Sequence, residues 1–70
     1  MSRWRAVKAA RVRAALHRLG WRAKRERGSH VVLAREGSPD FVWAFHDREE
    51  IGPAMLARIA RHTGLAPDNL

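Results

Sequence analysis

Two amphipathic helical patterns enclose three short strand-like segments, and this order limits the folds open to a chain of 70 residues. Over residues 7–19, apolar side chains recur at the spacing i, i+3, i+4 and i+7, which predicts a helix from Val7 to Leu19. A second pattern predicts a helix that begins at Pro53 and ends at Gly64. Its apolar stripe consists of Met55, Leu56, Ile59 and Ala60. Each helix therefore has one face to bury against another element.

The segments between the two helices have the residue types and lengths of β-strands. They are residues 21–27, residues 30–35 and residues 41–45. The turn Gly28-Ser29, a loop over residues 36–40 and the polar segment Asp47–Glu50 provide the connections. Such short connections between successive strands predict an antiparallel meander. The sequence therefore predicts an α+β fold of order α-β-β-β-α, with both helices on one face of a three-stranded sheet.

The chain contains no cysteine, so neither a disulfide nor a thiolate zinc site stabilises its fold. It is predicted to form a single domain over residues 1–70, which buries only about 60% of its unfolded surface. It has no apolar run of about 18 residues, so we expect no membrane span. The N-terminal residues lack the apolar stretch of a secretory signal. Together these features predict a cytoplasmic protein.

Basic residues are concentrated in the first half of the chain. Residues 1–35 contain 11 basic and 1 acidic side chain, a net charge of +10, whereas residues 36–70 contain 3 basic and 6 acidic, a net charge of −3. Twelve of the 14 basic residues are arginine. A basic surface of this kind indicates a polyanionic partner, of which nucleic acid is the commonest.

Several motifs lie at the boundaries of the predicted elements. The first helix ends in Leu16-His17-Arg18-Leu19-Gly20-Trp21, and the second strand is opened by Arg27-Gly28-Ser29-His30. His46 follows the third strand, and the last helix runs from Gly52-Pro53-Ala54-Met55-Leu56 to Thr63-Gly64-Leu65. In this order, these motifs resemble the HicA toxin family, also called YcfA-like. The resemblance covers the chain from about Val7 to Leu70.

The resemblance implies a double-stranded-RNA-binding-domain-like fold and a toxin of a type II toxin–antitoxin system. HicA proteins are small cytoplasmic mRNA interferases, and a HicB antitoxin neutralises them. The resemblance therefore implies mRNA as substrate and a HicB-like antitoxin as partner, with a monomer when free and a heteromer when bound. Ala44 stands where many family members have proline, so we expect a more regular third strand here.

His30 follows the Gly28-Ser29 turn at the start of a predicted strand, where it is accessible and held in place. Cleavage of RNA without a metal requires one group that removes the proton of a ribose 2′-hydroxyl and one that protonates the leaving 5′-oxygen. Histidine does either near pH 7, because its ordinary pKa lies near 6.5. The spacing alone leaves a second interpretation open, an exposed histidine without a function. The resemblance implies the catalytic role, with His30 as general acid or base.

The residues around His30 are candidates for binding the phosphate of RNA. Gly28 lets a phosphate approach the backbone closely. Charge stabilisation is expected from Lys24, Arg25, Arg27 and the backbone N–H of Ser29. The Ser29 side chain is expected to shape the turn, since no base-and-carboxylate arrangement would make it a nucleophile. His46 has two interpretations, a second proton-transfer group or a cap of the loop Asp47–Glu50.

The four histidines and seven carboxylates show no metal-ligand spacing such as H-x₃-H, so we expect no metal and no cofactor. His17 and His62 are expected on helix surfaces. Trp21 and Trp43 are expected to pack in the core, and Trp4 is open between packing and stacking on bases. Two alternatives to a nuclease fit the residues: a non-catalytic RNA-binding module of the same fold, and a degenerate toxin kept as a HicB partner. The binding module does not need His30, whereas the nuclease does.

Overall fold

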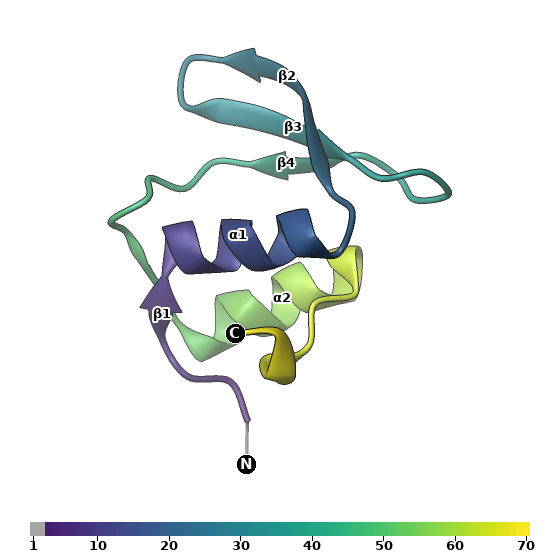
Figure 1. Cartoon of the computed structure of the whole chain (residues 1–70). Helices are drawn as coiled ribbons and strands as arrows, with labels where there is room; N and C mark the ends of the chain where they lie inside the picture. The colour runs from purple at the N-terminus through teal and green to yellow at the C-terminus, as the bar shows by residue number, and fades with distance from the viewer. Residues whose placement is uncertain (1–2) are drawn as a thin grey trace.

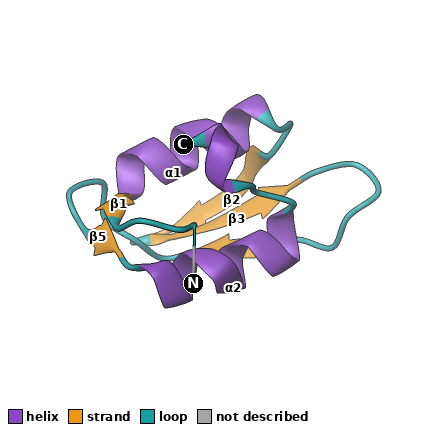
Figure 2. Ribbon diagram, turned by 90° about the horizontal axis from the view of Figure 1, so that it is seen from below, coloured by secondary structure: helices purple, strands orange, loops and turns teal. Residues whose placement is uncertain are grey.

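The computed structural model describes residues 3–70 and has the predicted α+β architecture (Figure 1). Its elements in chain order are β1 (Val7–Lys8), α1 (Ala9–Arg18), β2 (Arg22–Arg27), β3 (His30–Ala34), β4 (Phe41–Trp43), β5 (Glu50–Ile51), α2 (Pro53–Thr63) and a short 3-10 helix, η1 (Pro67–Asn69). Strands β2, β3 and β4 form an antiparallel sheet in that order, and both helices lie on one side of it (Figure 2). The predicted fold class is confirmed. Met1 and Ser2 of the predicted domain lie outside the described residues.

The sheet has an inner face toward the helices and an outer face toward solvent. In β3, Val31 and Leu33 are buried, whereas His30 is exposed and Val32 is half-buried. Because side chains alternate along a strand, the two buried residues point inward and the other two point outward. Trp43 of β4 pairs with Val31 and is also buried. The outer face is therefore left free by both helices.

Strand β2 lies at the edge of this sheet, and its pairing with β3 is irregular. The register shifts between Ala23 and Arg25, so Lys24 lies at a bulge, which explains the imperfect alternation of the sequence here. Beyond the bulge, Arg25 pairs with Val32 and Arg27 pairs with His30. Paired residues share a face, so both arginines lie on the outer face beside His30.

The first helix begins two residues later than predicted, because Val7 and Lys8 form strand β1. This strand pairs with β5, which contains Glu50 of the predicted polar connection. The first two N–H groups of α1 donate to carbonyl oxygens of the loop between β4 and β5, from Ala9 to Glu49 at 2.7 Å and from Ala10 to Asp47 at 3.1 Å. No side chain caps this end of the helix. Backbone carbonyls therefore accept the hydrogen bonds from the first N–H groups of α1, a role that a capping side chain has at many helix N-termini.

The third strand is shorter than the predicted segment 41–45, since β4 ends at Trp43. The predicted length of this strand is therefore wrong, although its three residues pair with β3 without a register shift. After Trp43 the chain leaves the sheet and descends to α1 (Figure 1), where the carbonyls of Asp47 and Glu49 meet the helix N-terminus. The strand thus ends before Ala44 even without a proline at that position.

The core lies between the inner face and the helices, and its largest members are Trp21, Trp43, Leu16, Ile51, Leu56, Ile59 and Val12. The predicted packing of Trp21 and Trp43 is confirmed. Trp4 is half-buried against this core, which supports packing as its role. Met55, a predicted member of the second apolar stripe, is instead exposed. The buried stripe of α2 runs through Leu56, Ile59 and Thr63, at i, i+3 and i+7.

Candidate functional site

The β2–β3 turn positions His30 as the first residue of β3. Gly28 has a φ of +60°, and Ser29 has a negative φ. This combination is typical of a type II′ turn, which takes glycine at its first central position. The turn joins Arg27 and His30, which face each other across the hairpin. A short, defined turn thus holds the exposed imidazole at the end of the sheet.

His30 opens onto a groove on the outer face of the sheet, which we call the outer groove. Its lining residues are Arg25, Arg27, His30, Val32 and Val42, and its volume is about 280 Å³. Val42 is the middle residue of β4. Its side chain is 54% exposed, whereas its neighbours Phe41 and Trp43 face the core. The groove therefore combines two guanidinium groups and one imidazole with an apolar floor.

The two guanidinium groups of the outer groove are not neutralised. Within residues 3–70, the side chains of Arg25, Arg27 and His30 make no hydrogen bond and no ion pair. Most other basic residues within residues 3–35 have partners. Ion pairs with carboxylates are formed by Arg3, Arg13 and Lys24. Hydrogen bonds to carbonyl or side-chain oxygens are donated by Lys8, Arg18, Arg22 and Arg35. The outer groove is thus a place where positive charge is available to an anion.

The Lys24 ammonium does not line the outer groove. Its Nζ lies 3.0 Å from Oδ2 of Asp40, and both side chains are partly exposed. An exposed ion pair of this kind offsets the lysine charge without contributing much stability. Among the predicted phosphate-binding side chains, the structure therefore brings Arg25 and Arg27 to His30 and pairs Lys24 elsewhere.

The other predicted site residues line a second groove, which we call the inner groove. It lies at the other side of the same turn, has a volume of about 310 Å³, and is lined by Arg13, Glu26, Gly28, Ser29, Val31, Trp43, Phe45, His46 and Asp47. The structure thus separates His46 from His30, which line different grooves. Gly28 and Ser29 line the inner groove only, and the two grooves lie on opposite faces of the β2–β3 hairpin.

The loop that carries His46 is anchored by its backbone. The carbonyl of His46 accepts from the N–H of Glu49 at 2.9 Å, and its own N–H donates to Oε2 of Glu49 at 3.2 Å. The carbonyls of Asp47 and Glu49 then bind the start of α1. These contacts support the structural interpretation of this loop, and they leave the exposed ring of His46 facing the inner groove.

Several groove residues were not predicted from the sequence. Val42 and Val32 lie on the outer face, which strict alternation around Trp43 and Leu33 would have indicated. Arg13 comes from α1, and only the packing of the helix against the sheet brings it near Glu26. Phe45 follows the end of β4, where the periodicity of the strand no longer applies.

The described residues give two negative findings. Within residues 3–70, no group of three or more His, Cys, Asp or Glu side chains is arranged to hold a metal ion. No helix in this part of the chain is long and apolar enough to cross a membrane.

A protein-family model, described as the HicA toxin of bacterial toxin–antitoxin systems, matches residues 9–65 of the chain. The chain belongs to the HicA toxin family. HicA toxins act in bacterial toxin–antitoxin systems, so this HicA protein is a toxin that pairs with an antitoxin. No curated protein and no solved structure shows significant similarity to it. The matched residues include every residue of the outer and inner grooves.

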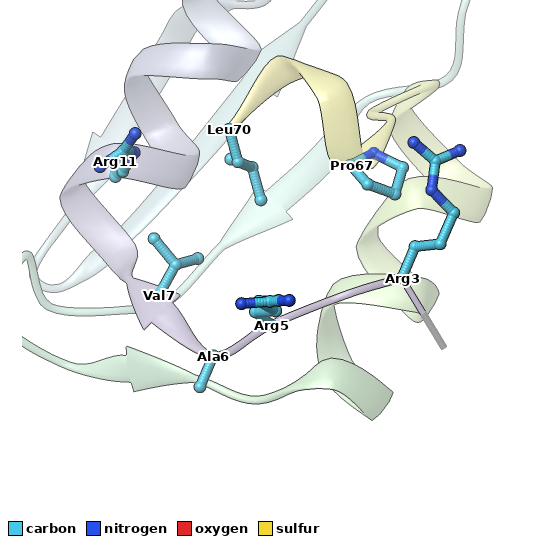
Figure 3. Close-up of a pocket in the computed structure, with 7 residues that line it drawn as sticks. All are labelled: Arg3, Arg5, Ala6, Val7, Arg11, Pro67 and Leu70. Carbon is cyan, nitrogen blue, oxygen red and sulfur yellow. The ribbon is translucent and has the colours of Figure 1, made fainter. Parts of the chain in front are cut away.

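A third hollow in this HicA chain lies mostly outside the matched residues (Figure 3). Its lining residues are Arg3, Arg5, Ala6, Val7, Arg11, Pro67 and Leu70, and its volume is about 320 Å³. Arg3 is paired with Asp68 at 2.8 Å. The lining contains no histidine, carboxylate or hydroxyl group, so it offers no side chain for proton transfer near pH 7.

Proposed function

We propose that this HicA protein is the toxin of a type II toxin–antitoxin system and acts as a metal-independent endoribonuclease, with His30 as general acid or base. The observation that carries the proposal is the outer groove, where an exposed imidazole lies beside two guanidinium groups without partners. This arrangement provides a proton-transfer group and charge stabilisation at the same place, which are the two requirements of RNA cleavage.

The reaction we propose uses the ribose 2′-hydroxyl as the nucleophile. The 2′-oxygen forms a bond to the adjacent phosphorus, and the bond from phosphorus to the 5′-oxygen breaks. Neutral His30 takes the proton from the 2′-hydroxyl, or protonated His30 gives one to the leaving 5′-oxygen, and solvent serves the other transfer. The products are a 2′,3′-cyclic phosphate and a 5′-hydroxyl. One such group supplies roughly 10²- to 10⁴-fold acceleration.

Arg25 and Arg27 of the outer groove bind the phosphate in this proposal. Their guanidinium groups stabilise the negative charge that develops on the phosphate oxygens. Nothing lies within 4 Å of the position that a Cβ of Gly28 would occupy, so the RNA strand can approach the backbone of the turn closely where it continues from the phosphate toward the inner groove, which Gly28 and Ser29 line. Lys24 contributes to the surrounding positive potential.

The partners we propose are mRNA and a HicB-like antitoxin, and the free toxin is a monomer in the cytoplasm. An antitoxin neutralises the toxin by laying an acidic surface over the outer groove. Charge complementarity of this kind speeds association and weakens with salt. The charge distribution supports this arrangement, because the unpaired arginines and His30 share one face.

The proposal predicts that the purified chain cleaves RNA in the presence of EDTA and leaves 5′-hydroxyl ends. His30→Ala should abolish cleavage and leave the circular dichroism spectrum unchanged, because His30 is exposed and makes no packing contact with the core. His62→Ala is the control, since His62 is exposed on α2 and lines neither groove, although its ring stacks on Phe41. End mapping of cleaved RNA measures the outcome.

Two results would contradict the proposal in different ways. Activity that disappears with EDTA and returns with a divalent ion would exclude the metal-independent mechanism. Tight RNA binding by both the wild type and His30→Ala, without cleavage by either, would instead identify a non-catalytic RNA-binding module or a degenerate toxin.

A further inference from the structure

The outer and inner grooves share one turn but have different chemistry. The lining of the outer groove carries two guanidinium groups and no carboxylate. The lining of the inner groove carries two carboxylates, from Glu26 and Asp47, together with Arg13, a hydroxyl and an imidazole. A phosphate is attracted to the first environment and is repelled by the carboxylates of the second. The inner groove therefore suits a part of the substrate that is not the phosphate.

An aromatic pair lines one side of the inner groove. The ring centroids of Trp43 and Phe45 are 5.0 Å apart at an interplanar angle of 65°. Trp43 is buried, whereas Phe45 is only half-buried and keeps part of its ring accessible. Nucleic-acid bases stack on accessible aromatic rings in many proteins that bind single strands. The pair therefore provides a surface for a base.

The polar groups of the inner groove retain hydrogen-bonding capacity. Oε1 of Glu26 lies 3.8 Å from Nη2 of Arg13, which is beyond hydrogen-bond distance. The carboxylate of Asp47 makes no hydrogen bond or ion pair among residues 3–70. Trp43 Nε1 is buried and has no hydrogen-bond partner there either. A buried donor without a partner is unfavourable, and such groups in native structures call for an explanation such as a site.

We infer that the inner groove is a base-recognition site, and that it selects a base with an exocyclic amino group. A carboxylate accepts hydrogen bonds and donates none, so Glu26 and Asp47 match the two N–H donors of the amino group of cytosine, adenine or guanine. The single N3–H donor of uracil lies between two carbonyl oxygens, which a carboxylate repels. The inference deepens the proposed function and rests on it for the identity of the ligand as RNA. It places the phosphate in the outer groove and a neighbouring base in the inner groove.

This arrangement requires a substrate that is single-stranded at the site. The two grooves lie on opposite sides of the Gly28-Ser29 turn, so a strand that fills both crosses the end of the hairpin. A base in the inner groove exposes its pairing edge to the carboxylates, and a base within a duplex has that edge occupied. Paired RNA is therefore excluded from the inner groove.

The test compares two RNA hexamers, oligocytidylate and oligouridylate, whose bases differ at C4, an amino group against a carbonyl, and at N3, an acceptor against an N–H donor. Binding is measured by fluorescence anisotropy with the His30→Ala chain, so that cleavage does not interfere. We expect oligocytidylate to bind about tenfold more tightly, which corresponds to one good base contact. Glu26→Gln combined with Asp47→Asn should reduce this ratio to about one, because an amide also donates to the uracil carbonyl.

The control removes two carboxylates elsewhere. Glu36→Gln combined with Glu50→Gln changes the net charge by the same amount and should keep the tenfold ratio, since neither residue lines the inner groove.

A Phe45→Leu variant should weaken binding of both hexamers, because it keeps apolar packing and loses the aromatic face. The inference would be overturned if the His30→Ala chain bound both hexamers with equal affinity. It would also be overturned if the Glu26 and Asp47 variant kept the tenfold preference for oligocytidylate. A hexamer duplex that binds as tightly as the single strands would overturn it as well.

A cleavage experiment separates this inference from the proposed function. In a randomised RNA, the wild type should cut next to an amino-bearing base, and the Glu26 and Asp47 variant should cut without this preference. Cleavage without any base preference would overturn the inference and leave the nuclease intact. A base preference in binding, without cleavage by the wild type, would overturn the nuclease and leave the base-recognition site.

Discussion

Gly28 holds the β2–β3 turn in a backbone conformation that L-amino acids with a side chain rarely adopt. Its φ is +60°, whereas nothing lies within 4 Å of the position of an added Cβ. Glycine is therefore required here because of the backbone dihedral angle, and not because a side chain would collide with neighbouring atoms. Because this turn places His30 next to Arg27 and separates the two grooves, the conformation of one residue determines the geometry of the whole site.

Gly28→Ala should lower the free energy of unfolding by about 1 kcal/mol, since a left-handed conformation costs that much for alanine. For a chain of this size the loss corresponds to a decrease in Tm of roughly 5 °C. Gly52→Ala is the control, because Gly52 has a φ of −83° and nothing lies within 4 Å of an added Cβ. Thermal unfolding followed by circular dichroism measures both. A Gly28 variant as stable as the Gly52 variant would show that the turn does not need this conformation.

At the scale of elements, the end of α2 is linked to the start of the sheet through Thr63. This residue is fully buried, and its Oγ1 donates to the carbonyl of Ile59 at 2.8 Å and accepts from the N–H of Leu65 at 3.3 Å. Its carbonyl accepts from Nε1 of Trp21 at 3.1 Å. A buried hydroxyl and a buried indole are thus both satisfied at the point where two elements meet.

Thr63→Val keeps the shape of the side chain and removes the hydroxyl, so the N–H of Leu65 loses its acceptor. We expect a loss of about 1–3 kcal/mol, the cost of a buried polar group without a partner. Amide hydrogen exchange at Leu65 should become faster. Thr63→Ser keeps the hydroxyl and should keep the protection of Leu65, although it loses one methyl group. Unchanged exchange at Leu65 in the valine variant would show that this hydrogen bond contributes little.

The elements that the sequence predicted are those with a local pattern. The stripe of α2 and the turn Gly28-Ser29 are contained in short windows, so periodicity and turn residues are enough to locate them. Strands β1 and β5 contain two residues each and pair Val7 with Ile51, across most of the chain. Two residues are too few to form a period, so only the folded chain reveals this pairing.

The residues of the candidate site could likewise be predicted from the sequence only in part. His30, Arg25 and Arg27 belong to one hairpin, and their neighbourhood follows from the position of the turn. The division between two grooves depends on which face each side chain takes, and the bulge at Lys24 changes that alternation. The inner groove also needs residues from α1 and from the loop after β4, whose approach is a property of the tertiary structure.

At the scale of the whole molecule, the placement of charge matters more than its sum of +7. Arg25 and Arg27 are on the outer face beside His30, whereas Arg58 and Arg61 line a separate hollow on the exposed side of α2. None of the four makes an ion pair among the described residues. The two pairs of arginines have the same charge and both lack ion-pair partners, so they differ only in their position on the molecule. Replacing one pair or the other is therefore a matched comparison.

Arg25→Gln combined with Arg27→Gln should weaken binding of all single-stranded RNA sequences and reduce the slope of log affinity against log salt by about 1.4. Each phosphate contact with a single strand contributes about 0.7 to this slope through counterion release. Arg58→Gln combined with Arg61→Gln gives the same net charge and should leave the slope unchanged. Affinities from anisotropy titrations at several salt concentrations provide the measurement. Equal slopes in both double variants would place the phosphate contacts outside the outer groove.

The fully exposed strand β2 has a further consequence for the behaviour of the protein at high concentration. As an edge strand it offers unpaired N–H and carbonyl groups along one side, and such an edge can add strands from other copies. Five of its six side chains are charged, four of them positively, so two copies repel each other edge to edge. Polyanions or high salt screen this repulsion. The same arginines that we propose bind RNA therefore also keep the protein from aggregating, and their neutralisation removes that protection.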